Sequence, residues 1–254
     1  MILVVAGTRD GREMALELAA HGYPVLVSVV SDYGRRLIEQ DNLPVNACPL
    51  DEGGFAELIG RRGIRAVVDV SHPYASGVSV NVQAACRQQG IPYLRYERLS
   101  SPLPDYPRLH VAPDATAAAK TAAALGKVVF LTTGSRTLPV FKQEPLLADH
   151  RLIARVLPEP QVIEQCLALG FTPGEIVAVQ GPFSHEFNVA LFKEYNSEVI
   201  VTKNSGLVGG ADSKFSAAIE LGLELIVIDR PQDGTGNCVS TSEAVVKFVE
   251  EVFG

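Results

Sequence analysis

The sequence predicts two α/β domains, each a doubly wound, mainly parallel sheet of the Rossmann-like kind, which together enclose a cleft. Three observations favour this fold class. Short apolar runs alternate with amphipathic segments along the chain, which is typical of parallel strands separated by crossover helices. The alternation is interrupted by the proline-containing segment 96–108 and restarts in full from Lys127. The length of 254 residues and the hydrophobic fraction of 47% allow two buried cores.

The first half, residues 1–125, is expected to form the N-terminal domain. Its apolar runs predict strands near 1–6, 24–30, 44–48, 65–70, 91–95 and 108–111. The segments between them predict helices near 11–21, 34–40, 53–62, 76–89 and 114–125. Gly63 and Gly90 lie where helices should end, since glycine readily adopts the left-handed conformation of a helix end. Asp10 with Glu13, and Ser76, are expected to cap the first and fourth helices.

The second half, residues 126–254, is expected to form the C-terminal domain, with the boundary close to Gly126. It repeats the same plan, and its apolar runs predict strands near 127–131, 151–156, 175–179, 198–202 and 224–229. The amphipathic segments predict helices near 159–169, 184–194, 213–221 and 240–252. Ser184 stands where the second of these helices should begin, and serine is a favoured N-cap.

Charge and cysteine content limit the classes of partner. The formal net charge of −7 argues against nucleic acid or an anionic membrane surface as a partner. The four cysteines form no C-x-x-C pair, which argues against a disulfide framework and against a protein-bound metal such as zinc. The chain enters a predicted strand without a basic leader, and no apolar run approaches about 18 residues. We therefore expect a cytoplasmic protein. A monomer and a homodimer are both open.

Four predicted strands run directly into small polar clusters. These clusters are Gly7-Thr8-Arg9-Asp10, Ser71-His72-Pro73-Tyr74, Thr132-Thr133-Gly134-Ser135 and Lys203-Asn204-Ser205-Gly206. In open parallel α/β sheets, ligands bind in the crevice beyond the carboxyl ends of the strands. The clusters therefore predict an enzyme's site, and Lys203, a lysine at a strand end, is its expected catalytic residue.

The turn from Gly7 to Gly11 is similar to a dinucleotide-binding turn, in which glycine lets the backbone approach a phosphate at a helix N-terminus. The full G-x-G-x-x-G spacing is absent, so this turn alone leaves cofactor binding and an ordinary tight turn both open. Ser31 and Asp32 follow the second strand, with Arg35 and Arg36 close behind. A carboxylate suits the ribose 2′-hydroxyl of NADH and arginines suit the 2′-phosphate of NADPH, so the choice of cofactor stays open.

Weaker signals come from polar residues next to these clusters. His72 lies at the exit of its strand, where a ligand contact and a structural role are both open, and Asn81 lies on the helix that follows. The N-cap role is sufficient to explain Ser184. Asn188, one turn further, has no such structural explanation and is expected to face a ligand.

Taken together, these segments resemble the precorrin-6A reductase family of cobalamin biosynthesis. The matching pieces in the first half are Gly7-Thr8, Ser71-His72-Pro73-Tyr74-Ala75, Asn81, Ala85-Cys86 and Gly90 to Arg98. Those in the second half are Leu131 to Ser135, Ala154 to Pro158, Gly181 to Asn188, Thr202 to Gly206, Leu221-Gly222 and Arg230-Pro231. The resemblance covers nearly the whole chain in order, so it is far more specific than any single motif.

The resemblance implies an oxidoreductase that transfers a hydride from NADPH or NADH to carbon 19 of precorrin-6A, giving precorrin-6B. The turn from Ser31 to Gly34 is more similar to the cobalt-dependent branch, which implies cobalt-precorrin-6A as the substrate. The residues expected to bind the cofactor are Gly7, Thr8, Arg9, Asp10, Ser31, Asp32, His72, Thr133, Gly134 and Ser135. A macrocycle with several carboxylates needs cations and helix N-termini around it. The residues expected to bind it are Ser76, Asn81, Arg95, Arg98, Arg136, Arg155, Ser184, Asn188, Ser205, Gly206 and Lys214.

Lys203 has two roles open to it: its ammonium could stabilise negative charge, or it could deliver the proton that carbon 18 gains. The electrostatic role is favoured, because the conjugated ring can take its proton from solvent. Two other functions are considered for the chain, namely an NAD(P)-dependent reductase of another small substrate and a non-catalytic two-domain ligand sensor. A sensor leaves the lysine at the strand end unexplained. The sequence contains no nucleophile elbow, Walker loop or Tyr-x-x-x-Lys pair.

Overall fold

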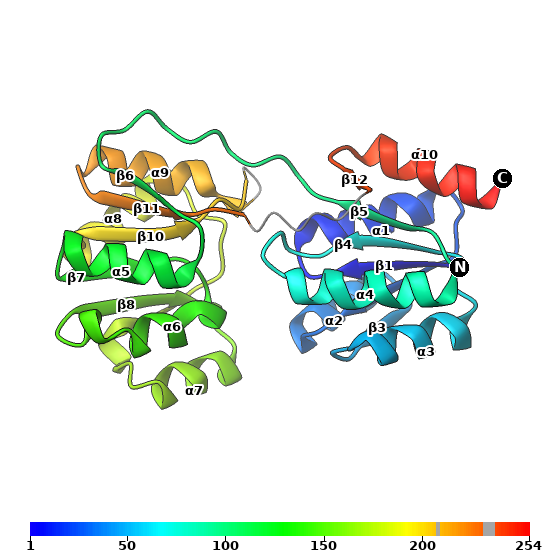
Figure 1. The fold of residues 1–254 in the computed structure, drawn as a ribbon, viewed down its shortest axis with the longest axis horizontal. Helices are drawn as coiled ribbons and strands as arrows, with labels where there is room; N and C mark the ends of the chain where they lie inside the picture. The colour runs from blue at the N-terminus through cyan, green and yellow to red at the C-terminus, as the bar shows by residue number, and fades with distance from the viewer. Residues whose placement is uncertain (207–208, 231–236) are drawn as a thin grey trace. The chain divides into compact units, whose positions relative to one another are not determined.

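The computed structural model describes residues 1–206, 209–230 and 237–254, which form two compact units. Unit 1 comprises Met1–Leu99 together with Gln232–Gly254, and unit 2 comprises Ser100–Pro231. Each unit is a parallel sheet with helices on both faces (Figure 1). The predicted fold class, two Rossmann-like α/β domains, is confirmed.

The sheet of unit 1 has the strand order β12-β5-β4-β1-β2-β3, and every described pairing in it is parallel. Its strands are β1 (Ile2–Ala6), β2 (Val25–Val29), β3 (Val45–Ala47), β4 (Ala66–Val70), β5 (Tyr93–Tyr96) and β12 (Cys238–Val239). Its helices are α1 (Arg9–Ala20), α2 (Asp32–Gln40), α3 (Glu52–Arg62), α4 (Ser76–Gln89) and α10 (Ser242–Phe253). Read from the β3 edge, this is the doubly wound order 3-2-1-4-5-6, with β12 in the sixth place.

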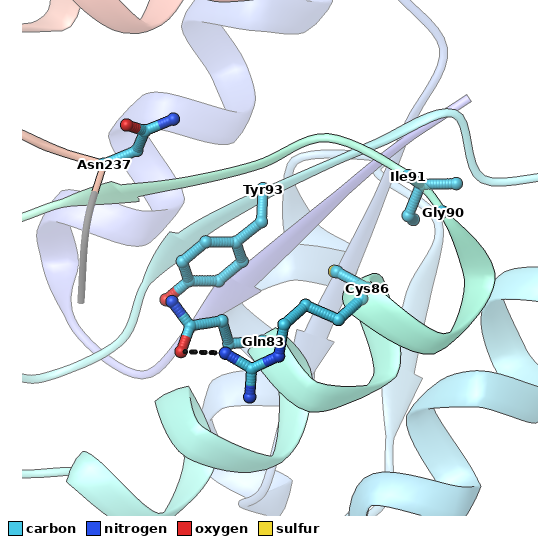
Figure 2. A pocket seen from close by; sticks show the side chains of 7 residues that line it. Gln83, Cys86, Gly90, Ile91, Tyr93 and Asn237 are labelled. Atoms are coloured by element: carbon cyan, nitrogen blue, oxygen red, sulfur yellow. Dashed lines mark hydrogen bonds between the residues drawn. The ribbon is translucent and has the colours of Figure 1, made fainter.

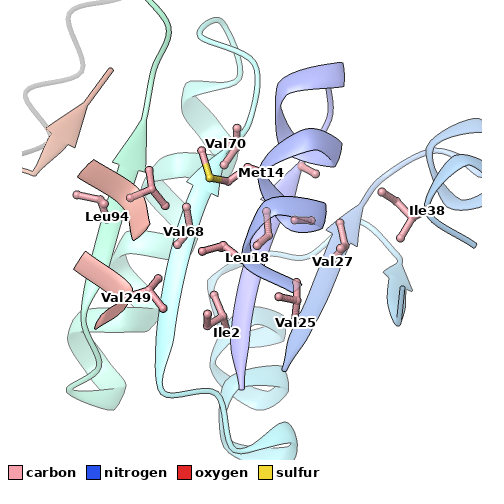
Figure 3. Close-up of a cluster of buried hydrophobic side chains, with 14 of the residues drawn as sticks. Ile2, Met14, Leu18, Val25, Val27, Ile38, Val68, Val70, Leu94 and Val249 are labelled. Atoms are coloured by element: carbon pink, nitrogen blue, oxygen red, sulfur yellow. The ribbon is translucent and has the colours of Figure 1, made fainter. Parts of the chain in front are cut away.

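The core of unit 1 consists of two apolar layers, one on each face of the sheet. Side chains of β1, β2, β4 and β5 meet Met14 and Leu18 of α1 and Val249 of α10 on one face (Figure 3). On the other face the same strands meet Phe55 and Ile59 of α3 and Val82 of α4. Because both faces are covered, the strands carry near-continuous apolar runs, which is the pattern that made them predictable.

The sheet of unit 2 has the order β6-β11-β10-β7-β8-β9, and its described pairings are also parallel. Its strands are β6 (Leu109–Ala112), β7 (Val128–Leu131), β8 (Arg151–Val156), β9 (Ile176–Ala178), β10 (Val199–Lys203) and β11 (Glu224–Ile228). Its α-helices are α5 (Ala115–Leu125), α6 (Leu138–Gln143), α7 (Pro160–Ala168), α8 (His185–Glu194) and α9 (Ala211–Glu220). Its described 3₁₀ turns include η1 (Ser135–Thr137), η2 (Pro145–Leu147) and η3 (Pro173–Glu175).

One face of this second sheet packs on Phe192 of α8 and Phe215 of α9. The alanine-rich helix α5 and the short helix α6 lie on the other face, with Ala118, Ala122 and Phe141 fully buried. The strands β7, β8, β9, β10 and β11 repeat the order of the first five strands of unit 1. The sixth place is taken by β6, which precedes the others in the chain.

The division into units corrects the expected boundary close to Gly126. β6 and α5 belong to unit 2, because β6 pairs with β11 from Leu225↔Leu109 to Ile228↔Ala112. At the other end of the chain, β12 and α10 return to unit 1. Local sequence patterns do not reveal these pairings, since the partners lie more than a hundred residues apart.

Two expected helix caps are also corrected. Helix α1 begins at Arg9 after Thr8, and Asp10 pairs with Arg98 instead of capping the helix. Helix α4 follows Ala75 with no side-chain cap, so Ser76 is its first residue. The cap at Ser184 is confirmed, because its Oγ accepts a hydrogen bond from the N–H of Phe187 at 3.2 Å. In the part of the chain that the structure describes, no helix combines the length and apolar character needed to cross a bilayer.

Candidate functional site

Each unit has one point in its sheet where the strand order reverses, and ligands of doubly wound sheets bind there. In unit 1 this switch point lies between β1 and β4, so the residues after Ala6 and after Val70 meet at one edge. In unit 2 it lies between β7 and β10, which places Thr132–Ser135 next to Lys203–Gly206. The four polar clusters predicted from the sequence therefore form two neighbouring pairs, one in each unit.

The two glycines of the first turn serve different purposes. A Cβ on Gly7 would meet no atom within 4 Å, so the space beside its backbone is open. A Cβ on Gly11 would lie 2.7 Å from Ala6 Cβ and 2.9 Å from Ala6 Cα, so only glycine lets α1 pack this closely on β1. In a dinucleotide-binding turn, one glycine gives room to the phosphate and another allows close helix–strand packing. The turn fits a dinucleotide, although its spacing is not the usual one.

The charged side chains around this turn are engaged within unit 1. Asp10 forms a largely buried ion pair with Arg98, which ties the start of α1 to the segment that follows β5. Arg9 is exposed and pairs with Glu13 at 2.6 Å. The carboxylate of Asp10 balances the charge of Arg98, and a contact from Arg98 to a substrate carboxylate stays a prediction.

At the exit of β2, Ser31 caps α2 by accepting a hydrogen bond from the N–H of Gly34 at 3.0 Å. Asp32 is exposed and lies 3.3 Å from Arg35, which also pairs with Glu39 at 3.2 Å. A carboxylate and an arginine thus remain side by side here, so the geometry does not separate NADH from NADPH.

A buried network holds the exit of β4 in place. Asp69 Oδ1 accepts a hydrogen bond from the N–H of Ser71 at 2.9 Å, and its Oδ2 accepts one from Tyr93 Oη, also at 2.9 Å. Arg95 Nη1 donates to Asp69 Oδ2 at 2.9 Å and to Ser79 Oγ at 2.6 Å. The network fixes the backbone of Ser71 next to His72, whose Nδ1 accepts the N–H of Tyr74 at 3.2 Å.

The position of Arg95 corrects its expected role as a substrate ligand. Its side chain is 1% exposed and lies between Asp69 and Glu97, 2.9 Å and 3.2 Å away. Burial opposes the charge of Arg95, but the two carboxylates together raise its pKa. Arg95 is therefore a structural cation. Ser76 and Asn81 on α4 are partly exposed, and their contact with a ligand stays a prediction.

The switch point of unit 2 is lined by hydroxyls and a cation. Thr137 Oγ1 donates to Thr133 Oγ1 at 2.6 Å, and Gly134 has a φ of +78°, which glycine adopts without strain. Lys203 ends β10, beside these residues, and is partly buried. Burial, helped by repulsion from Arg136, lowers the pKa of Lys203 to about 8. Its ammonium therefore holds a proton that can be transferred near neutral pH.

The loop after Lys203 is closed by hydrogen bonds to one carbonyl. Ser205 Oγ donates to the carbonyl of Gly209 at 3.1 Å, and Lys214 Nζ donates to the same oxygen at 3.3 Å. Ser205, Gly206 and Lys214 are all buried. Of the three, Lys214 is the one that adds a positive charge to this edge of the sheet.

Arg155, near the end of β8, is a buried cation. It is 8% exposed, and it makes no ion pair with any residue in the described ranges. Burial lowers its pKa to about 10. Its Nη1 donates to Asn188 Oδ1 at 2.7 Å.

This contact corrects the expectation that Asn188 faces a ligand. Asn188 is 0% exposed, and its amide donates to the carbonyl of Ser184 at 2.8 Å and to Ser213 Oγ at 3.3 Å. Asn188 therefore positions Arg155. The roles of Asp69, Ser79 and Ser213 were not predictable from the sequence, because no local pattern marks a residue whose partners are distant in sequence.

The two units differ in how their cations are balanced. In unit 1, Arg95 and Arg98 face carboxylates. In unit 2, Arg136 and Arg155 have no ion-pair partner within residues 1–206, 209–230 and 237–254, and Lys203 lies within electrostatic reach of Arg136. An acidic protein that gathers cations at one sheet edge has a surface suited to an anionic ligand.

A separate hollow of about 390 Å³ lies in unit 1 between the end of α4 and the start of β5 (Figure 2). Its described lining includes Gln83, Arg87 and Tyr93, and Arg87 Nη1 donates to Gln83 Oε1 at 3.2 Å. Cys86 also lines it, but burial raises the pKa of this thiol to about 12, so the thiol is unreactive. The hollow lies towards the amino end of β5, away from the switch point.

Comparison with known proteins assigns the chain to a family. A family model described as precorrin-6x reductase CbiJ/CobK matches residues 1–250. The chain belongs to this precorrin-6x reductase family. The resemblance inferred from the sequence motifs is thereby confirmed, and so is the expectation that the chain is an oxidoreductase.

Relatives in the precorrin-6x reductase family match the chain over almost its full length. It is 42% identical over 247 residues to cobalt-precorrin-6A reductase of Priestia megaterium, covering 97% of this chain and 96% of the relative. It is 38% identical over 233 residues to cobalt-precorrin-6A reductase of Salmonella typhimurium, covering 91% and 87%. A solved structure of CobK precorrin-6A reductase superposes with a TM-score of 0.81 at 27% identity, covering 99% of this chain and 97% of that one. Of the family motif Arg230-Pro231, Pro231 lies outside the described residues.

Proposed function

We propose that this chain reduces cobalt-precorrin-6A to cobalt-precorrin-6B in cobalamin biosynthesis, with a reduced nicotinamide as hydride donor. The observation that carries this proposal is the end-to-end similarity to two enzymes named cobalt-precorrin-6A reductase. The hydride goes to carbon 19 of the macrocycle and a proton goes to carbon 18. We place the enzyme in the cytoplasm as a monomer or homodimer.

For the cofactor, the open space beside Gly7 supports binding of the pyrophosphate at the turn between β1 and α1. When bound, a reduced nicotinamide supplies the hydride, and the protein supplies orientation. Backbone N–H groups of Gly7 and Thr8 and the start of α1 would hold the phosphates. Ser31 with Asp32 would lie near the ribose, and His72 would lie at the β4 side. Contacts from Arg9, Asp10, Thr133, Gly134 and Ser135 to the cofactor stay predictions.

For the substrate, the cations of unit 2 are the expected carboxylate ligands. Arg155 and Arg136 have no ion-pair partner among the described residues, so a carboxylate would find their donors available. The same edge of the sheet would also be lined by Lys214, Ser205 and Gly206. At the exposed start of α8, Ser184 would be a further contact for the substrate. Arg95 and Asn188 are assigned to supporting positions instead, and a substrate contact from Arg98 stays a prediction.

For the proton, we assign Lys203. Sequence alone favoured a purely electrostatic role, but a lysine whose pKa is about 8 matches the requirement for a general acid near neutral pH. Burial is the main cause of the low pKa, and the side chain is still partly exposed, so the amine can be reprotonated from solvent. Lys203 Nζ would deliver its proton to carbon 18 and recover it from solvent.

The test is anaerobic incubation of the enzyme with cobalt-precorrin-6A or metal-free precorrin-6A, each with NADH or NADPH. When cobalt-precorrin-6A is the substrate, we expect the absorbance of the nicotinamide and that of the tetrapyrrole to change at the same time. The relative rates give the cofactor preference and the preferred form of the macrocycle. If neither tetrapyrrole leads to oxidation of the nicotinamide, the proposed function is contradicted.

A further inference from the structure

Two phenylalanine rings at the start of α8 stack on one another at the carboxyl edge of the sheet of unit 2. The rings of Phe183 and Phe187 have centroids 4.7 Å apart and planes only 18° from parallel. Phe187 is 40% exposed, so a large part of its ring faces water. We infer that the exposed ring of Phe187, backed by the ring of Phe183, forms an aromatic shelf on which the macrocycle of the substrate stacks. The inference rests on the proposed function and names a surface of the same site.

The shelf is held in place by the fold. Ser213 Oγ of α9 donates to the carbonyl of Phe183 at 2.9 Å, and the N–H of Phe187 donates to Ser184 Oγ at 3.2 Å. Asn188 links the same turn to α9 through Ser213 Oγ. The backbone on both sides of the shelf is thus fixed before any ligand binds, which lowers the entropic cost of binding.

A buried cation lies against Phe183, the ring that backs the shelf. The guanidinium carbon of Arg155 is 4.9 Å from the centroid of the Phe183 ring. Arginine carries five N–H donors, and the described residues accept one of them, through Asn188 Oδ1. None of the nitrogens of Arg155 is both fully enclosed and without a partner. The remaining donors are therefore accessible to an incoming acceptor.

An exposed aromatic residue alone carries no functional meaning, because single apolar side chains are common on protein surfaces. Here a flat apolar surface adjoins a cation that lacks an ion-pair partner among the described residues, and both lie at the sheet edge that bears Lys203. A ligand that satisfies both features has a planar conjugated body and a peripheral carboxylate. The tetrapyrrole has this chemistry.

The nicotinamide cofactor is a poorer occupant of the shelf. Its aromatic rings could also stack on Phe187, but the turn with room for its pyrophosphate is at Gly7 in unit 1. The shelf is lined by residues of unit 2 alone, where the available cations lie.

The test replaces the ring while keeping an apolar side chain. In Phe187→Leu we expect the KM for cobalt-precorrin-6A to rise by about 2- to 13-fold, the range that an aromatic stack of 0.5–1.5 kcal/mol provides. The KM for the nicotinamide should be unchanged. Phe187→Tyr retains the ring and should retain the wild-type KM. Leu167→Ala changes a similarly exposed apolar residue, on α7, and serves as the matched control.

A second readout needs no turnover. Cobalt-precorrin-6A is titrated into enzyme without cofactor, and the shift of its visible absorbance reports stacking. Phe187→Leu should weaken this binding and Phe187→Tyr should not. Unchanged binding and KM in a folded Phe187→Leu protein would overturn the shelf, and so would a rise confined to the KM of the nicotinamide. Absence of turnover by the wild-type enzyme would instead overturn the proposed function, and the titration would still decide the shelf.

Discussion

At the scale of single residues, Gly7 and Gly11 separate a role in binding from a role in folding. Gly7→Val should leave the free energy of unfolding within about 0.5 kcal/mol of wild type, because the added side chain enters open space. It should weaken cofactor binding, because that side chain occupies the expected place of a phosphate. Calorimetric titration of the nicotinamide cofactor and thermal unfolding measure the two effects.

Gly11→Ala is the matched control for that change. Its Cβ would press on Ala6, so we expect a loss of about 1–3 kcal/mol of stability from overpacking. Unchanged cofactor affinity in a folded Gly7→Val protein would remove the phosphate from this turn.

Lys203 provides a prediction for the pH dependence of turnover. A general acid must carry its proton, and burial lowers the pKa of Lys203 to about 8, so kcat should fall as the pH rises through 8. Arg136→Ala removes a repulsion that contributes to this low pKa, so the fall should move to higher pH. The measurement is kcat against pH at saturating substrate.

Substitutions of Lys203 itself distinguish its two roles. Lys203→Arg should not restore the activity lost in Lys203→Ala, because guanidinium does not readily release a proton. Partial rescue by arginine would indicate electrostatic anchoring instead. Wild-type turnover in Lys203→Ala would show that the residue takes no part in the catalytic step.

At the scale of elements, β4 and β5 are joined by a buried ion pair whose loss should be costly. Asp69→Asn leaves Arg95 with a weaker partner in a fully buried place, and we expect a loss of about 3–5 kcal/mol of stability. Tyr93→Phe removes only the hydroxyl that donates to Asp69, so it should cost about 1 kcal/mol. Urea denaturation measures both changes, and equal losses in the two variants would contradict a dominant role for the ion pair.

The elements themselves were largely predictable from the sequence, because each is encoded locally. The strand at Arg151–Val156 and the helix at Ser76–Gln89 lie at the predicted positions, since apolar periodicity is set by burial against the sheet. The partners of charged side chains were not predictable. Asp10 looked like a helix cap, but it pairs with Arg98, which lies 88 residues away in sequence.

The candidate site, too, was predictable where it depends on local sequence and not where it depends on tertiary contacts. Within each unit, the two strand ends that carry polar clusters lie side by side, because parallel topology gathers carboxyl ends at one edge. That all four clusters serve one site stays a prediction. Whether a cation at such an end is free for a ligand depends on tertiary contacts. Arg95 and Arg155 look alike in sequence, yet one is held by Asp69 and the other has no ion-pair partner in the described part of the chain.

At the scale of the whole molecule, unit 1 depends on a helix encoded far from the rest of it. Val245 and Val249 of α10 are fully buried against Val68 and Leu94. Arg65 lies over the ring of Phe253 at 4.4 Å and donates to the carbonyl of Val252 at 2.9 Å.

Deletion of residues 240–254 should therefore unfold unit 1 and spare unit 2. Hydrogen exchange should show faster exchange of the amides of β1 and β4 and unchanged protection in β7 and β10. Val249→Ala should also destabilise unit 1, by about 2 kcal/mol, because it leaves a cavity in the core. Equal loss of protection in both units would show that they unfold as one.

The insertion of unit 2 between β5 and β12 has a consequence for synthesis. A ribosome completes Ser100–Pro231 before it makes β12 and α10, and domains tend to fold as units while the chain grows. The unit encoded second can thus finish folding first. Until α10 emerges, unit 1 presents an unpaired β5 edge and an uncovered apolar face at Val68 and Leu94. A chaperone that recognises exposed apolar strands would meet the nascent chain at this surface.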